Sequence, residues 1–160
     1  MVASVKQNAD AIKALPVVRS YVVDPHKELV RPDHTRHRKW LDGKDLFEAN
    51  RAVLTDRGKA LLDEAAEWVN EHKEEGSEFV VAAFAPDGGN PEFTHTLTQK
   101  QSEVVAEYLR GQHKVHRTGW WWWSNRNVRA VGCGSAPSPV PETETLPAAR
   151  VELIVFVPQS

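Results

Sequence analysis

The sequence predicts an α+β domain in which two helices pack on one face of a mixed four-stranded sheet. Two kinds of pattern lead to this fold class. Apolar side chains recur at helical spacing in two segments, residues 55–75 and 97–111. Shorter apolar segments typical of strands precede, separate and follow these helices: residues 44–48, 78–85, 127–134 and 149–158. The predicted order is therefore β-α-β-α-β-β, which makes a two-layer sandwich.

The first 43 residues are expected to form an N-terminal helical arm and a basic linker, ahead of a domain that spans residues 44–160. Apolar residues near the start follow the coiled-coil spacing of three and four: Val2, Val5, Ala9 and Ile12. Pro16 ends this helix, because proline disfavours helical backbone at the residue before it. Residues 24–40 are polar and basic, so we expect a linker or a surface loop there.

The first helix of the domain is expected to begin at Thr55 or Asp56 and to stop at Gly76, since these residue types favour the two ends of a helix. Its apolar residues fall on one stripe: Leu61, Leu62, Ala65, Trp68 and Val69. One face of this helix is therefore expected to be buried.

The second helix is expected to begin with a capping box, Thr98-x-x-Gln101, and to end at Gly111. Its buried stripe is predicted to contain Val104, Val105, Tyr108 and Leu109. Residues 78–85, between the two helices, are apolar on both faces, so this strand is expected in the middle of the sheet.

Composition excludes several classes of function. The chain has 160 residues and a formal net charge of −2, which argues against a nucleic-acid partner. No segment approaches the roughly 18 apolar residues of a membrane span, and the N-terminus lacks the apolar core of a secretory signal. The protein is then either cytosolic or a piece of a longer exported chain. No cofactor is indicated.

The segments described above resemble the OmpA-like C-terminal domain of bacterial envelope proteins over residues 44–158. "LFEANRAVLTDRGKALLDEAAEWV" is similar to that family's Phe-x-x-Asn opening and Leu-x-x-x-Gly helix. "VVAAFAPDGGNPEFTHTLTQKQSEVVAEYL" resembles its strand, ligand loop and second helix, and "VGCG" with "ARVELIVFV" resembles its Gly-x-Gly turn and closing strand. Residues 10–33 more weakly resemble the stretch that joins a helical stalk to such a domain, as in MCE-type envelope proteins.

The resemblance implies a non-catalytic domain that holds peptidoglycan. In the family, a loop carboxylate takes the ammonium of diaminopimelate, and an arginine in the second helix takes its carboxylate. These two positions fall on Pro86 and Gln101 here, so both charged groups are missing. Asp87 is one residue further and can substitute after a small shift of the loop. Arg150 also matches a family position, where a structural role is expected.

The candidate ligand-binding residues are accordingly Asn50, Asp87, Thr98 and Gln101, in a pocket that lacks the carboxylate and the arginine of the family. We expect weakened peptidoglycan recognition by an anchoring or scaffold domain on the periplasmic side of a bacterial envelope, with an upstream signal or anchor. We expect no enzyme activity, because no nucleophile, base and oxyanion donor are found together.

Four consecutive tryptophans, Trp120, Trp121, Trp122 and Trp123, follow the second helix, and we expect them at the end of that helix opposite the pocket. Either two rings pack inward and two cover a loop, or they form an exposed aromatic patch. Arg117 and Arg126 flank the run and favour the exposed patch. Its occupant would be a partner protein, a second copy of the chain, the interfacial layer of a membrane or a glycan. The alternative function is thus a protein-interaction or oligomerisation module that binds no peptidoglycan.

Three further motifs have a structural and a functional interpretation. His34-x-x-His37 and His113-x-x-His116 have metal-ligand spacing, but solvated histidines are the simpler interpretation, and no metal is predicted. Cys133 is a buried residue or a nucleophile. The basic run at residues 36–40 is a solvated loop or a contact for phosphate head groups.

Overall fold

The computed structural model describes residues 24–121 and 123–159, so the predicted coiled-coil seam near the N-terminus lies outside the described residues. The elements of the described residues follow in the order α2 (Pro25–Leu29), β1 (His34–Asp42), α3 (Gly43–Leu46), α4 (Asp56–Glu71), β2 (Glu78–Phe84), α5 (Pro91–His113), β3 (Val128–Gly132) and β4 (Arg150–Pro158).

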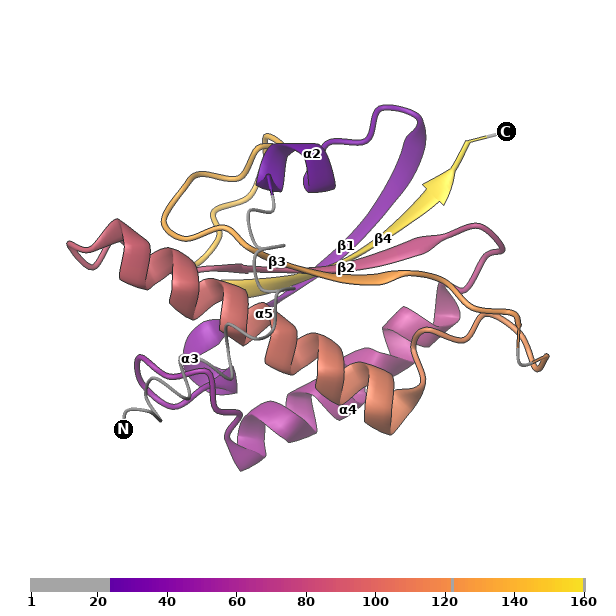
Figure 1. Ribbon diagram of the computed structural model, residues 1–160, viewed down its shortest axis with the longest axis horizontal. Coiled ribbons are helices and arrows are strands. Elements are labelled where there is room, and N and C mark those ends of the chain that lie inside the picture. The colour runs from indigo at the N-terminus through magenta and orange to yellow at the C-terminus, as the bar shows by residue number, and fades with distance from the viewer. Residues whose placement is uncertain (1–23, 122, 160) are drawn as a thin grey trace, which may run out of the picture.

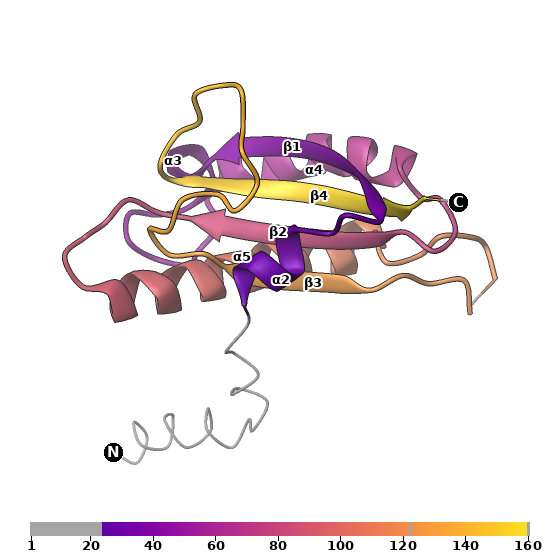
Figure 2. The same ribbon diagram turned by 90° about the horizontal axis from the view of Figure 1, so that it is seen from above.

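The sheet has four strands in the order β1-β4-β2-β3, and only the β2–β3 pair is parallel. The two long helices α4 and α5 lie side by side on one face of it, and α2 lies on the other (Figures 1 and 2). The predicted α+β sandwich with a mixed four-stranded sheet is confirmed. Strand β2 is central, as its apolar composition predicted, and its residues from Phe79 to Phe84 are buried.

Apolar side chains close both faces of the sheet. The helix-facing core includes Leu62 and Val69 of α4, Val105 and Leu109 of α5, and alternate residues of the strands. The opposite face buries a smaller cluster: Leu29, Val80, Ala82, Phe84, Val131, Cys133, Ile154 and Phe156. Leu29 comes from α2, which therefore covers part of this face.

The expected loop at residues 24–40 is wrong, because this segment forms α2 and most of β1. β1 pairs with β4 from His34↔Pro158 to Asp42↔Arg150. The expected strand at 44–48 is also wrong: Asp42 accepts a hydrogen bond from the Lys44 amide at 2.9 Å and caps the short helix α3. Charged residues hid β1, since a charged edge strand resembles a loop in sequence.

Helix α5 begins seven residues before the predicted capping box at Thr98. The side chain of Asn90 is the cap and accepts hydrogen bonds from the Glu92 and Phe93 amides, both at 3.1 Å. Pro91 occupies the first helical position, where a missing amide hydrogen is tolerated. In α4 the predicted cap Thr55 is confirmed, with the Gly58 amide donating to its hydroxyl at 2.9 Å.

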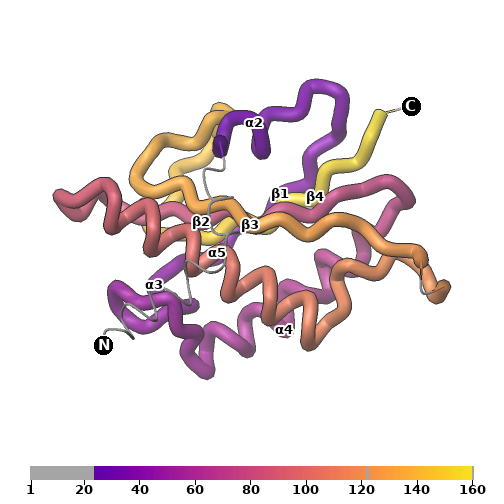
Figure 3. Tube along the Cα trace, in the orientation of Figure 1, coloured from indigo at the N-terminus to yellow at the C-terminus, as the bar shows by residue number. Residues whose placement is uncertain are grey.

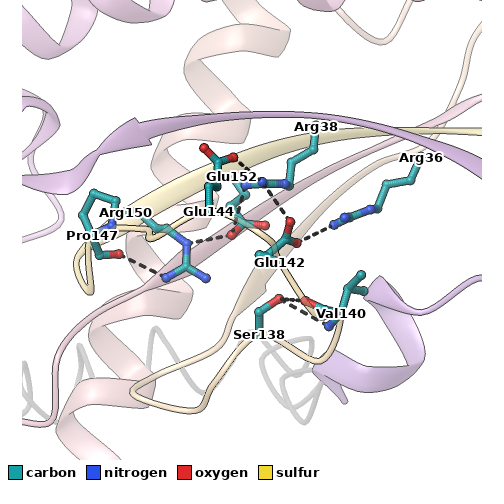
Figure 4. A network of polar contacts seen from close by, with 9 residues as sticks. All are labelled: Arg36, Arg38, Ser138, Val140, Glu142, Glu144, Pro147, Arg150 and Glu152. Atoms are coloured by element: carbon teal, nitrogen blue, oxygen red, sulfur yellow. Dashed lines mark hydrogen bonds and ion pairs between the residues drawn. The ribbon is translucent and has the colours of Figure 1, made fainter.

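A proline-rich loop, residues 133–149, runs across the face of the sheet that α2 also covers (Figures 1 and 4). Two acidic residues of this loop bind the basic run of β1. Arg36 pairs with Glu142 at 3.1 Å, and Arg38 pairs with Glu142 and Glu144, both at 2.9 Å. The basic run that was expected to be a solvated loop is thus a strand whose arginines fasten the proline-rich loop.

Beneath the loop lies a buried carboxylate, Glu152, which is 1% exposed. Arg150 donates to it at 2.6 Å, and Arg38 lies 3.8 Å away (Figure 4). Arg150 also donates to the Pro147 carbonyl at 3.1 Å and stacks over the Phe84 ring at 3.9 Å. The structural role expected for Arg150 agrees with these contacts.

α5 and β3 approach each other very closely at Gly132. A Cβ atom there would lie 2.3 Å from the Gln99 backbone nitrogen, which excludes any larger residue. The Gln99 side chain accepts a hydrogen bond from the Gly132 amide at 2.7 Å and donates to the Ala130 carbonyl at 3.2 Å. Thr98 accepts from the Gly134 amide at 2.9 Å. The Gly-x-Gly turn is therefore where the second helix is fastened to the sheet.

Replacing Gly132 by alanine is expected to lower the free energy of unfolding by about 2 kcal/mol or more, because backbone atoms of α5 must move. Gly111→Ala is the matched control: no atom lies within 4 Å of the added Cβ, so a gain of up to about 1 kcal/mol is expected. Urea unfolding followed by circular dichroism measures both. Equal effects of the two substitutions would contradict the close approach.

Replacing Arg38 by methionine is expected to lower the free energy of unfolding by about 2 kcal/mol, because it removes one cation from three carboxylates, one of them buried. Arg36→Met, two residues away on the same face, removes a single ion pair and is expected to cost less than about 1 kcal/mol. The same urea experiment compares them, and a larger effect at Arg36 would disprove the assigned roles.

Candidate functional site

A cavity of about 260 Å³ lies at the end of the sheet where β2 stops and β4 begins. Its walls come from four places in the sequence: residues 43–44 with 47–50, residues 84–86, residues 149–150, and the first half of α5 through Leu97 and Gln101. The start of α5 and the end of β2 meet at this end of the molecule (Figures 1 and 2). Of the four candidate ligand-binding residues, Asn50 and Gln101 line this cavity.

Gln101 reaches the cavity from α5. Its side chain is 9% exposed, and its amide nitrogen donates to the Arg51 carbonyl at 3.2 Å. This hydrogen bond ties α5 to the loop that precedes α4. The side chain of Gln101 is a neutral amide, and one of its N–H groups is already hydrogen-bonded inside the protein.

Asn50 lines the cavity from the loop before α4, where its backbone has a φ of 56°. The loop is closed by two backbone hydrogen bonds, from Glu48 to the Val53 carbonyl at 3.0 Å and from Arg51 to the Glu48 carbonyl at 3.1 Å. Asparagine tolerates this left-handed backbone better than most residues. The turn therefore accounts for an asparagine at this position independently of any ligand.

Pro86 lines the cavity, whereas Asp87 does not. The Asp87 carboxylate accepts a hydrogen bond from the Gly89 amide at 2.9 Å and so closes its own turn. Gly89 has a φ of 89°, which favours glycine at the end of this turn. In this arrangement the Asp87 carboxylate stabilises its own loop and lies outside the cavity lining.

Thr98 is fully buried and lies outside the cavity lining. Its hydroxyl donates to the Thr94 and His95 carbonyls, each at 3.0 Å, and accepts from Gly134. All of its hydrogen bonds are therefore internal, and its position is that of a residue that joins α5 to the sheet.

Two charged residues that were not singled out from sequence also line the cavity, Lys44 and Glu48. Both are exposed, and Glu48 pairs with Arg51 at 2.7 Å. The expected strand at 44–48 concealed them, because it assigned this segment to the sheet and not to α3 and the loop that follows it. They give the rim one exposed cation and one carboxylate that is already paired.

The tryptophan run lies at the opposite end of α5, as expected (Figures 1 and 3). Trp120, Trp121 and Trp123 are 78%, 45% and 58% exposed, so the inward-packing alternative is wrong for these three rings; Trp122 lies outside the described residues. Trp120 stacks on Trp121 at 4.0 Å, and Trp121 stacks on Trp123 at 4.8 Å between centroids. The three rings form an exposed stack, named here the tryptophan stack.

The histidine pairs do not come together as metal ligands. The rings of His34 and His37 have different neighbours, since His34 contacts Phe156 at 6.1 Å and His37 contacts His72 at 4.6 Å between centroids. His113 bonds Asp63 at 2.7 Å. Within residues 24–121 and 123–159, no group of three or more histidine, cysteine, aspartate or glutamate side chains is placed to hold a metal ion.

None of the helices in the described part of the chain is long and apolar enough to cross a membrane. No family model and no curated protein matches this sequence.

Solved structures do share its fold. The periplasmic domain of Helicobacter pylori MotB (residues 97–256) matches with a TM-score of 0.54 and 14% identity, covering 80% of this chain and 86% of that one. An outer membrane protein from Borrelia burgdorferi B31 gives 0.52 and 15%, covering 81% and 93%. The cell wall anchor of the type VI secretion system from Pseudomonas aeruginosa gives 0.51 and 16%, covering 76% and 82%. The OmpA-like fold that the sequence predicted is confirmed.

Cys133 is expected to be inert in the folded protein. It is 4% exposed, and burial, together with the nearby Glu152 carboxylate, raises the pKa of its thiol to about 12. Because the thiolate is the reactive form, Ellman's reagent should label Cys133 at mildly alkaline pH only after denaturation. Fast labelling of the native protein would instead support the nucleophile interpretation.

Proposed function

We propose that this chain is a non-catalytic anchoring or scaffold domain of the bacterial cell envelope whose recognition of peptidoglycan is weakened. One observation carries the proposal. Pro86 and Gln101, which stand where the OmpA-like resemblance places a carboxylate and an arginine, line the same cavity. In this proposal a cavity persists where the resemblance places the family's pocket, with neutral residues at the positions of its two charged side chains.

The loss of charge has a predictable size. A hydrogen bond to a charged group contributes about 1.5–3 kcal/mol, and the chain lacks two of them at these positions. Removing both weakens binding by roughly a hundredfold or more. Proline supplies neither a charge nor an amide hydrogen, and Gln101 has a donor engaged with the Arg51 carbonyl.

The charges that remain near the cavity compensate little. Arg150 is committed to Glu152 and to the Pro147 carbonyl. Lys44 and Glu48 are exposed, and pairing by such side chains is worth at most about 1 kcal/mol. A zwitterionic amino acid therefore meets polar groups here without the fixed anion and cation that would hold it tightly.

The structural neighbours support an envelope location, since the names of two of them refer to a periplasmic domain and to a cell wall anchor. By analogy we place this domain on the periplasmic side of the envelope, delivered by an upstream signal or anchor. This placement rests on the similarity of fold.

The alternative function is an interaction module that acts through the tryptophan stack and binds no peptidoglycan. The exposure of Trp120 and Trp123 favours it, because large apolar side chains grouped on a surface commonly mark a binding site. This alternative predicts that changes at the cavity leave all binding unaltered.

Restoring the two charged side chains tests the proposed function. The double substitution Pro86→Asp and Gln101→Arg is expected to raise retention on purified sacculi by about tenfold or more, because it rebuilds both charged contacts. Co-sedimentation with sacculi measures retention, and free diaminopimelate should compete with it.

The matched control is Pro137→Asp with Gln112→Arg, which makes the same two exchanges at exposed positions outside the cavity lining. Only the cavity variant should gain retention that diaminopimelate can compete for. An equal gain in both variants would show general charge attraction. Tight, competable retention of the unchanged protein would overturn the claim of weakened recognition.

A further inference from the structure

The tryptophan stack is carried by a defined turn between α5 and β3. The Thr118 amide donates to the Ser124 carbonyl at 2.8 Å, the Ser124 amide donates to the Trp121 carbonyl at 2.9 Å, and Arg117 forms an isolated bridge with Asn125. These contacts hold the turn in place. The turn projects from one end of the molecule, beyond α4 and β2 (Figures 1 and 3).

The base of this turn is anchored in the fold by Arg126, which sequence had suggested as part of the exposed patch. Arg126 is 7% exposed. It donates to the Val115 carbonyl at 2.7 Å, to the Ser77 hydroxyl at 3.2 Å and to the Val69 carbonyl at 3.3 Å. Its role is to position the turn, and the cation available on the surface beside the stack is Arg117.

Cations gather around the same end of the molecule. Burial lowers the pKa of the His116 ring, and four neighbouring cations lower it further: Arg110, Arg117, Lys114 and Lys73. All four lie at or beyond the C-terminal ends of α4 and α5. This group is named here the basic collar. Sequence did not reveal it, because its members come from α5 and from the loops that follow α4 and α5.

The acidic residues at this end are fewer. Glu74 lies near Arg126, and Glu75 shares a small hollow with Trp123. Glu71 ends α4 at this end of the molecule, and Glu78, at the start of β2, is already paired with Arg31. Glu71, Glu74 and Glu75 are therefore outnumbered by the four cations of the basic collar together with the buried Arg126.

We propose that the tryptophan stack and the basic collar together dock on the surface of an anionic phospholipid bilayer. Indole rings prefer the interfacial layer of a membrane, where one part of the ring is apolar and its N–H is hydrated. Lysine and arginine beside them are attracted to anionic head groups by about 1 kcal/mol each. A projecting aromatic turn with a basic surround supplies both contributions without any helix that spans the membrane.

The same charges argue against a second copy of this chain as the occupant. In a symmetric dimer each patch meets its own equivalent, so one basic collar would face another. Like charges placed against each other disfavour that pairing. A bilayer rich in anionic lipid supplies the opposite charge.

This surface and the cavity lie at opposite ends of the molecule. α5 has 23 residues and is therefore about 34 Å long, with Gln101 in its first half and the tryptophan turn beyond its last turn. Docking by the tryptophan stack would point the cavity away from the bilayer. The inference about lipid stands without the proposed wall function, although the two together would let the domain lie between a membrane and the wall.

Vesicle co-sedimentation of the full chain tests the proposal, with vesicles of equal parts phosphatidylglycerol and phosphatidylcholine, and of phosphatidylcholine alone. The protein should bind the anionic vesicles at low salt, with tighter binding than to the neutral ones and a blue shift of tryptophan fluorescence. Trp120→Ser with Trp123→Ser should lower the partition coefficient about tenfold or more. Lys114→Gln with Arg117→Gln should lower it by a similar factor for anionic vesicles only.

Controls come from the other end of the molecule. Phe93→Ser removes an apolar side chain that is 54% exposed, and Lys59→Gln with Lys100→Gln removes two exposed cations. These variants should bind vesicles as the unchanged protein does, and circular dichroism should show every variant folded. Absence of binding to anionic vesicles, or equal losses in the control variants, would overturn the proposal. A mass that rises with concentration in sedimentation velocity, and falls on substitution of the tryptophans, would assign the stack to self-association instead.

Discussion

The close approach of α5 to β3 determines where both candidate binding surfaces lie. At Gly132 the strand backbone and the Gln99 backbone are so near that no side chain fits between them. The Gln99 side chain accepts a hydrogen bond from the Gly132 amide of β3, and the Thr98 hydroxyl accepts one from the Gly134 amide in the turn that follows. These contacts fix the axial position of α5, so that Gln101 reaches the cavity and the far end of the helix carries the tryptophan turn. A shift of α5 by one turn, about 5.4 Å, would remove Gln101 from the cavity.

The second face of the sheet is closed by a small apolar cluster and by ion pairs that hold a loop over it. A short helix covers part of it through Leu29, while the proline-rich loop is held by ion pairs from Arg36 and Arg38. The arginine that borders the cavity, Arg150, belongs to this network through the buried Glu152. The loop and the cavity are therefore connected by a chain of charged contacts. The Arg150 guanidinium beside the cavity is thus already engaged by Glu152 and by the Pro147 carbonyl.

Sequence predicted the central features of the fold because their physical causes are local. An apolar run with no polar face specifies a central strand, and the stripe through Leu62 and Val69 specifies a helix on a sheet. The edge strand β1 was missed because its charges are satisfied by residues more than a hundred positions away, Glu142 and Glu144. The start of α5 was missed because two plausible caps exist, Asn90 and Thr98, and only the structure shows Thr98 bonded inside the helix.

Counting positions along the resemblance selected Pro86 and Gln101, and both line one cavity. It could not show that Asp87 turns back to bond Gly89, that Asn50 adopts left-handed backbone, or that Lys44 and Glu48 stand on the rim. Each of these depends on how a loop folds in three dimensions. The basic collar was likewise invisible, since it is assembled from the ends of separate elements.

The central claim is that the cavity lacks the charged side chains that would hold a zwitterionic amino acid. The most direct measurement is a titration of the isotope-labelled protein with free diaminopimelate, followed by the backbone amide resonances of residues 48–51, 85, 87–89 and 97–101. The account predicts small, non-saturating changes at these amides. Saturable shifts confined to the cavity, with Asp87 among the most affected residues, would contradict it.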